Sequence, residues 1–180
     1  MAKRALIAHP DGPPHDLRVG CKISQISRDA LKLEFVAIGT IRSVRVPQST
    51  QPQRVEGLWN HTCFEAFFAA ADGSYVEFNF APSGEWASFR FAGYREGMML
   101  ALDLGEPTIF VERDDRRLGL TAIIEFSQEE MVTTDKMALS AVIEETDGTK
   151  SYWALAHPPG KPDFHHPTCF AATLAPPGPS

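Results

Sequence analysis

The stretch from Cys63 to Phe91 constrains the fold more strongly than any other part of the chain. It contains three short runs rich in aromatic and small apolar residues, 63–70, 75–80 and 86–91, which are separated by turn-forming residues. Side chains of a β-strand alternate between its two faces, so each run can be sorted into two sets. One face is predicted to be a continuous apolar layer of the kind that fills a sandwich core: Phe64, Ala66, Phe68, Val76, Phe78, Phe80, Ala87, Phe89 and Phe91.

The opposite face of these runs mixes aromatic rings with polar and charged groups. It consists of Cys63, Glu65, Phe67, Tyr75, Glu77, Asn79, Trp86, Ser88 and Arg90. The apolar residues of the first two runs lie on the same side of the sheet if the loop between the runs is 71–73, where Gly73 can adopt a positive φ. Across the second turn we expect Phe80 to pair with Ala87. This register places Glu77 opposite Arg90, a pair that is also common on a solvated sheet, so the face predicts either a binding surface or an ordinary exterior.

Similar short runs recur along the chain between turn signals, and few segments look helical. This spacing predicts an all-β fold, an antiparallel β-sandwich of the jelly-roll kind. The expected strands are 22–27, 30–38, 41–46, 63–70, 75–80, 86–91, 108–112, 118–126, 138–144 and 151–156. A single helical turn is expected at 127–131, where Ser127 could cap the N-terminus. The 180 residues are predicted to form one domain, 17–174, between an N-terminal extension, 1–16, and a proline-rich frayed tail, 175–180.

Charge and cysteine content exclude several classes of protein. The 17 basic and 23 acidic side chains give a net charge of −6, so nucleic acid is not an expected partner. No apolar run reaches the roughly 18 residues of a membrane span, and the N-terminus has no signal-peptide core. We therefore predict no membrane association and a cytoplasmic location. The cysteines, which form no Cys-x-x-Cys pair, are expected to be buried free thiols: Cys21, Cys63 and Cys169.

Three segments resemble a known family of β-sandwich proteins. They are LWNHTCFEAFF at 58–68, YVEFNFAPSGEWASFRFAGYREGM at 75–98 and SYWALAHPPGKPDFHHPTCF at 151–170. Together with the expected strand order, they resemble the DOMON-like group of bacterial proteins, which is related to the carbohydrate-binding modules of family 9. The resemblance covers 19–174. It implies a sandwich or jelly roll with a ligand pocket on one sheet or at its edge, in a group whose members bind sugars or haem, and it implies no enzymatic activity.

A sugar site needs flat apolar surfaces against the C–H faces of the ring and polar groups for its hydroxyls. The sequence supplies both kinds, and we predict that Trp86 and Trp153 stack on the ligand, although each tryptophan could instead be a core or edge residue. The main hypothesis is a non-catalytic domain that binds a small polar ligand, a sugar or sugar-like compound, without a cofactor. The candidate ligand-binding residues are Trp59, His61, Glu65, Glu77, Asn79, Trp86, Arg90, Tyr94, Arg95, Trp153, Asp163, His165 and His166.

The histidines support a second hypothesis, a haem- or metal-binding domain. His61 or His165 could supply one axial ligand of a haem, and Met98 or Met99 the other. The chain has no Cys-x-x-Cys-His attachment motif. A metal ion could use His61, His157 or His165. Zinc needs three or four converging ligands, so the simpler interpretation is that the imidazoles of the proline-rich loop fix that loop against the sandwich.

Two further readings concern catalysis and association. Glu65 and Glu77 form a carboxylate pair of the kind that glycosidases use, but cross-strand neighbours are close in any sheet. The chain also lacks the common hydrolase and phosphate-binding motifs, so we predict no enzyme. A third hypothesis is an interaction domain whose polar and aromatic face, around Trp59, contacts a partner or a second copy in a homodimer.

Overall fold

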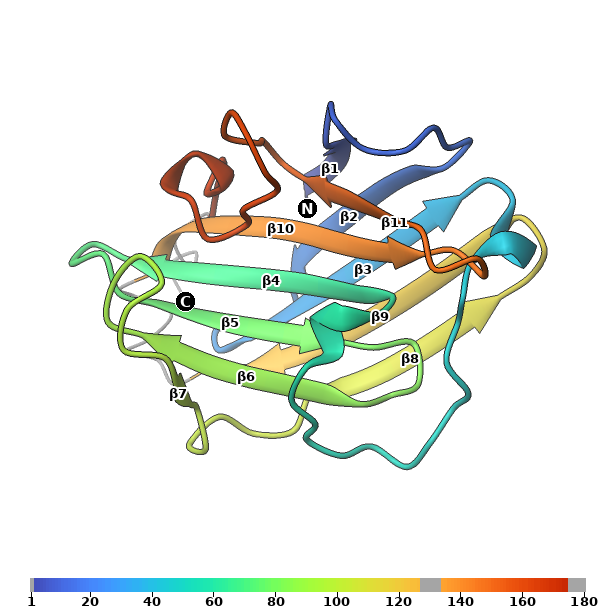
Figure 1. Ribbon diagram of the computed structural model, residues 1–180. Coiled ribbons are helices and arrows are strands. Elements are labelled where there is room, and N and C mark those ends of the chain that lie inside the picture. The colour runs from blue at the N-terminus through green and yellow to red at the C-terminus, as the bar shows by residue number, and fades with distance from the viewer. Residues whose placement is uncertain (1, 127–133, 175–180) are drawn as a thin grey trace.

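The computed structural model describes residues 2–126 and 134–174, and in that part of the chain it is an all-β protein without α-helices. The strands lie in two layers (Figure 1). They are β1 (Ala2–Ala8), β2 (Arg18–Gln25), β3 (Ala30–Ile38), β4 (Cys63–Ala70), β5 (Tyr75–Phe80), β6 (Trp86–Phe91), β7 (Met99–Leu100), β8 (Thr108–Arg113), β9 (Arg117–Glu125), β10 (Thr134–Glu144), β11 (Lys150–Ala154) and β12 (Ala172–Thr173). Three short 3-10 helices complete the structure: η1 (Ile41–Ser43), η2 (Leu58–Asn60) and η3 (Pro167–Cys169).

The two layers are halves of one curled antiparallel sheet. Its strand order is β7-β6-β5-β4-β10-β11-β1-β2-β3-β9-β8, and β12 also pairs with β10. We call β7-β6-β5-β4-β10-β11 the front sheet and β2-β3-β9-β8 the back sheet. β1 joins them, because Ile7 and Ala8 pair with β11 while the preceding residues pair with β2. This connection turns the sheet back on itself and encloses the core, which confirms the predicted antiparallel sandwich.

The core lies between the inner faces of the two sheets. Phe64 and Phe80 from the front sheet face Phe35 from the back sheet, and the rings of Phe35 and Phe64 stack with centroids 5.1 Å apart. All three are fully buried. Burying one such side chain stabilises the fold by roughly 1.5–3 kcal/mol. The apolar layer predicted for β4 and β5 is therefore confirmed, and the back sheet supplies the matching apolar side chains Val19, Cys21, Leu31, Leu33, Leu118, Leu120 and Ile124.

The face predicted for β6 is wrong by one residue. The first hairpin has the expected loop, with Gly73 at φ 89° and Ala70 bonded to Ser74. In the second hairpin, Phe80 pairs with Trp86 rather than with Ala87, because the backbone bond that closes the turn joins Ala81 and Glu85. A one-residue change of register moves every side chain of a strand to the other face.

This register has two consequences for the predicted faces. Ala87, Phe89 and Phe91 point to the outer side of the front sheet, and Glu77 lies opposite Phe89. Trp86 and Ser88 point to the inner side. There Arg54 lies over the Trp86 ring, with its guanidinium carbon 4.1 Å from the centroid, and donates a hydrogen bond of 2.6 Å to the Ser88 hydroxyl.

Several other segments differ from expectation or lie outside the described residues. Residues 2–8, expected in an N-terminal extension, form β1 in the middle of the sheet order. The expected strand 41–46 is instead η1 followed by a single bridge at Val44. The expected helical turn 127–131 and the tail 175–180 lie outside the described residues. No helix in the described ranges is long and apolar enough to cross a membrane.

A second apolar cluster lies on the outer face of the front sheet. The outward-facing Phe67, Tyr75 and Phe89 are buried there. Two segments cover them: residues 55–60, which include η2, and residues 155–170, which follow β11 and are drawn in orange to red in Figure 1. We call the second of these the covering segment. It keeps this sheet face away from bulk solvent and shapes the site described next.

Candidate functional site

A cavity of about 430 Å³ lies between the outer face of the front sheet and the segments that cover it. We call it the front cavity. Strands β4, β5, β6, β10 and β11 supply its base, and η2, the β6–β7 loop and the covering segment supply its sides. Its lining residues are Trp59, Asn60, Glu65, Glu77, Phe91, Arg95, Met98, Val142, Lys150, Tyr152, Pro162, Phe164 and His165.

Two buried carboxyl groups lie at the base of the front cavity. Glu65 on β4 accepts a hydrogen bond of 2.7 Å from the Ser140 hydroxyl, and Glu77 on β5 accepts one of 2.7 Å from the Asn79 amide. Glu65 is 3% exposed and Glu77 5%. Within the described part of the chain, no Lys or Arg forms an ion pair with either group. The shortest distance from either carboxyl group to a basic nitrogen is 3.8 Å, between Glu77 Oε2 and His165 Nε2.

The two carboxyl groups hold their protons to unusually high pH. Burial raises the pKa of Glu65 to about 8, and the nearby charge of Glu77 adds to the shift. Burial also raises the pKa of Glu77 to about 7, against the opposing effects of the Asn79 hydrogen bond and the Arg95 charge. Because the groups interact, they titrate as a pair. Near neutral pH the pair therefore retains a proton and can both donate and accept hydrogen bonds.

His165 is a neutral imidazole beside this pair. Burial lowers its pKa to about 4, and the Arg95 charge acts in the same direction. The Tyr75 hydroxyl lies 2.8 Å from Nδ1 and accepts a hydrogen bond from the Arg95 amide, so its own proton points to Nδ1. The proton of the imidazole then belongs on Nε2, the nitrogen that faces Glu77.

Asp163 fastens the covering segment to the β6–β7 loop. It accepts hydrogen bonds from the Arg95 guanidinium at 2.8 and 3.1 Å, from the Tyr94 hydroxyl and from the backbone amide of His165. Burial alone would raise the pKa of Asp163, but the bonds from Tyr94 and Arg95 hold it below its ordinary value. Arg95 has φ 56°, a strained backbone conformation that these contacts stabilise.

Aromatic side chains form the sides of the cavity. Trp59 in η2 is 37% exposed and its ring meets Phe89 edge-on at 5.8 Å. Tyr152 and Phe164, whose rings lie 6.2 Å apart, stand on β11 and the covering segment. The arrangement thus combines a flat, accessible indole with buried hydrogen-bonding groups.

The structure brings eight of the predicted site residues to this region. Trp59, Glu65, Glu77, Arg95 and His165 line the front cavity. Around them, Asn79 and Asp163 orient the lining groups, and Tyr94 lines an adjoining hollow that shares His165.

The other five predicted residues lie elsewhere. Trp153 belongs to the core and donates to the Ser151 hydroxyl at 2.9 Å. Trp86 lies on the inner side of β6, and Arg90 forms an ion pair of 2.6 Å with Asp103. His61 contacts Glu144 at 2.7 Å. His166 caps η3.

The predicted ligand-binding residues left out several lining residues, among them Lys150, Tyr152, Phe164, Asn60 and Met98, the last of which was considered only as a haem ligand. The alternation on β11 carries a signal for the first two, since they lie either side of the buried Ser151 and share a face opposite the core residue Trp153. The others come from 3-10 or loop segments, where no period indicates direction.

The candidate haem and metal ligands do not gather into one group within the described residues. His61, His157 and His165 are each engaged separately, by Glu144, by the Ile7 carbonyl and by Tyr75. The described residues contain no group of three or more His, Cys, Asp or Glu side chains arranged to hold a metal. An axial haem ligand directs an imidazole nitrogen into an apolar pocket, whereas Nε2 of His165 faces a carboxyl group.

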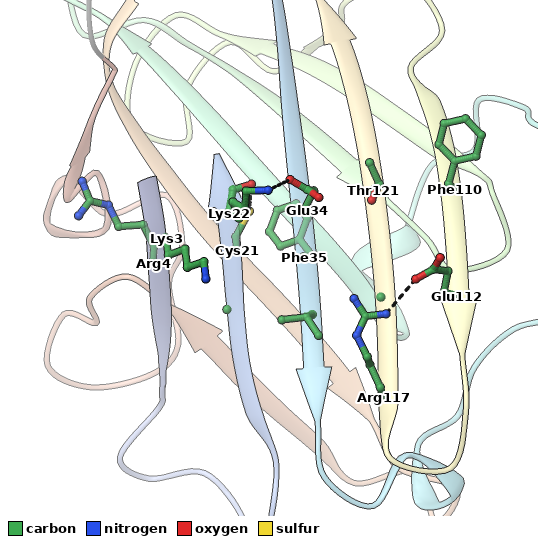
Figure 2. A pocket seen from close by; sticks show the side chains of 13 residues that line it. Lys3, Arg4, Cys21, Lys22, Glu34, Phe35, Phe110, Glu112, Arg117 and Thr121 are labelled. Carbon is green, nitrogen blue, oxygen red and sulfur yellow. Dashed lines mark hydrogen bonds and ion pairs between the residues drawn. The ribbon is translucent and has the colours of Figure 1, made fainter. Parts of the chain in front are cut away.

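A second hollow, of about 480 Å³, lies on the outer face of the back sheet (Figure 2). We call it the back groove. It exists because Gly20 and Gly119 have no side chains on either side of Val36, the residue that pairs with both. Two ion pairs lie in this groove, Lys22–Glu34 at 2.8 Å and Arg117–Glu112 at 3.0 Å, and Lys3 and Arg4 also line it.

Comparison with known proteins gives a likeness in fold. No protein-family model matches the chain, and no curated protein matches it. A crystal structure of a candidate carbohydrate-binding protein from Bacteroides uniformis superposes with a TM-score of 0.67 at 18% identity, covering 94% of this chain and 84% of that one. A carbohydrate-binding module of family 9 from Caldicellulosiruptor kristjanssonii, in complex with cellotriose, gives 0.52 at 8% identity, covering 88% and 74%. What is shared is the sandwich fold.

Proposed function

We propose that this protein is a non-catalytic carbohydrate-binding domain whose ligand occupies the front cavity. The observation that carries the proposal is the combination, in one cavity of about 430 Å³, of an accessible indole and two buried carboxyl groups able to exchange hydrogen bonds with hydroxyls. Likeness in fold to two structures described in carbohydrate-binding terms supports it. The relationship to DOMON-like proteins remains a prediction from the sequence.

In this proposal the cavity residues have distinct tasks. Trp59 supplies a flat surface for the C–H face of a sugar ring, a role first predicted for Trp86 and Trp153, which lie elsewhere. The protonated member of the Glu65–Glu77 pair donates to a sugar hydroxyl while the ionised member accepts. Such groups matter because a buried hydroxyl without a partner costs roughly 1–3 kcal/mol. In this proposal the protein binds and releases the sugar reversibly and does not change it chemically.

Calorimetric titration with cellotriose and a panel of other oligosaccharides tests this proposal. We expect binding by at least one sugar and a loss of affinity of about tenfold or more in Trp59→Ala, because stacking on an aromatic ring contributes about 1 kcal/mol beyond its buried area. Phe110→Ala is the matched control, since Phe110 is 59% exposed on the back sheet. Binding unaffected by Trp59→Ala, or no binding across the panel, contradicts the proposal.

A further inference from the structure

The front cavity buries two carboxyl groups that form no ion pair with a Lys or Arg side chain among the described residues. Glu65 and Glu77 reach it from neighbouring strands and are both more than nine-tenths buried. The described residues offer them a serine, an asparagine and a neutral histidine as partners, but no ion pair with Lys or Arg. Buried carboxylates in proteins are otherwise paired with cations or bound to metals.

The cavity lining includes two positively charged side chains of its own, Arg95 and Lys150. Arg95 is held by Asp163 in a two-point contact, so its charge is balanced. Lys150 stands at the end of β11 opposite Glu144 and forms no ion pair within the described ranges. Tyr75 keeps its proton, since burial raises its pKa to about 12. The two carboxyl groups at the base of the cavity therefore have no ion-pair partner among the described Lys and Arg side chains.

The sides of the cavity also suit a positive charge. Trp59, Tyr152 and Phe164 present aromatic rings around the carboxyl pair, and the faces of such rings attract cations, with Trp the strongest. Hydrogen bonds between an ammonium group and a carboxylate are roughly twice as strong as those between neutral groups. A neutral hydroxyl would form only the weaker hydrogen bonds with these carboxyl groups and would not attract the faces of the aromatic rings as a cation does.

We propose that the ligand of the front cavity is an aminated saccharide, whose ammonium group binds between Glu65 and Glu77 within the aromatic walls. This inference rests on the proposed function and narrows its ligand class. The proton balance follows directly. The free pair retains a proton near neutral pH, the bound ammonium favours the ionised form of both carboxyls, and the displaced proton goes to solvent.

The decisive experiment compares two matched trisaccharides, cellotriose and its counterpart built from β-1,4-linked glucosamine, which differ in a hydroxyl or an amine at carbon 2. In slightly acidic buffer, where the sugar amine is charged, we expect the glucosamine trisaccharide to bind about tenfold tighter or more. In that buffer both free carboxyl groups are largely protonated, so titrations in buffers of different ionisation enthalpy should show a net release of about one to two protons per ligand. Cellotriose binding should release far less.

Substitutions of the two carboxyl groups test whether they cause the preference for the aminated sugar and the proton release. Glu77→Gln and Glu65→Gln should each reduce the preference for the aminated sugar toward parity and reduce proton release, whereas Glu112→Gln in the back groove should change neither. If a carboxyl variant fails to fold, the buffer dependence of the unmodified protein still decides. Equal or tighter binding of cellotriose, absence of proton release, or a preference that survives both variants overturns the inference and leaves the proposed function standing. If no sugar binds, the proposed function itself fails.

Discussion

The outer faces of the front and back sheets are built by the same alternation of side chains, but they differ in their exposure to solvent. On the back sheet the outer face is open to solvent, and Phe110 is 59% exposed beside paired charges (Figure 2). On the front sheet the covering segment and η2 bury Phe67 completely. The loops that lie over a sheet, rather than the sheet itself, decide whether its outer face becomes a solvated exterior or a candidate binding site.

The two faces also treat carboxylates in opposite ways. The hydrogen bond from Lys22 holds the pKa of Glu34 on the back sheet below its ordinary value, so this glutamate is ionised and its charge is matched in water. Burial on the front sheet raises the pKa of Glu65 and Glu77 instead. The carboxylates of Glu34 and Glu112 on the back sheet are paired with cations of the protein, whereas Glu65 and Glu77 on the front sheet form no ion pair with a described Lys or Arg.

The largest expected difference between the faces is in packing. Phe67→Ala should lower the free energy of unfolding by about 3–5 kcal/mol, because it opens a cavity beneath the covering segment. The ring of Phe67 contacts those of His165 and Phe170 at 5.3 and 6.2 Å. Phe110→Ala should change the free energy of unfolding by no more than about 0.5 kcal/mol. Chemical denaturation of the two variants measures this, and equal costs would mean that the front face is not packed as described.

The fold was largely predictable from the sequence where turns are short. Gly73 marks the β4–β5 turn, so the inward Phe layer and the outward Glu65 and Glu77 follow from alternation alone. The β5–β6 turn also contains a glycine, Gly84 at φ 93°, but this glycine does not fix the length of the longer loop around it. An error of one residue in that length exchanged the faces of Trp86 and Phe89. Alternation gives two sets of side chains, but only the register says which set faces the core.

The next largest effect is the dependence of stability on pH. Folded Glu65 keeps its proton to a pKa of about 8, whereas in the unfolded chain it loses it near about pH 4. Between these values the folded state binds more protons, so the contribution of this group to stability falls as pH rises. Glu65→Gln should remove this fall and be more stable than the unmodified protein near pH 8, by on the order of 2 kcal/mol. Thermal or urea unfolding across that range measures it.

Glu34→Gln on the back sheet provides the control with the opposite sign. The lowered pKa of Glu34 means that its contribution is present above its ordinary value and is lost as pH falls. This variant should be less stable than the unmodified protein near neutrality and match it in acid. If the free energy of unfolding depends on pH in the same way for Glu65→Gln and for the unmodified protein, the pKa of Glu65 is not raised in the folded state.

The candidate site was predictable only in part, for a different physical reason. Glu65, Glu77 and Trp59 could be proposed because they are polar or aromatic groups on or beside outward-facing strand positions. Trp153 has the same chemistry but packs into the core, since composition alone does not reveal direction. Phe164 lies in the covering segment, whose path is fixed by tertiary contacts such as those of Asp163 rather than by any local pattern.

The smallest expected difference concerns one ion pair from each region. Asp163→Asn should lower the free energy of unfolding by about 1–2 kcal/mol, because Asp163 accepts bonds from Arg95 and the His165 backbone in a partly buried place. Glu112→Gln, which removes an exposed pair with Arg117, should change it by no more than about 0.5 kcal/mol. Urea denaturation at low and high salt separates them: the small effect of Glu112→Gln should disappear at high salt, and that of Asp163→Asn should persist. If both effects vanish in salt, Asp163 contributes only surface charge, and the covering segment must be held by its apolar contacts alone.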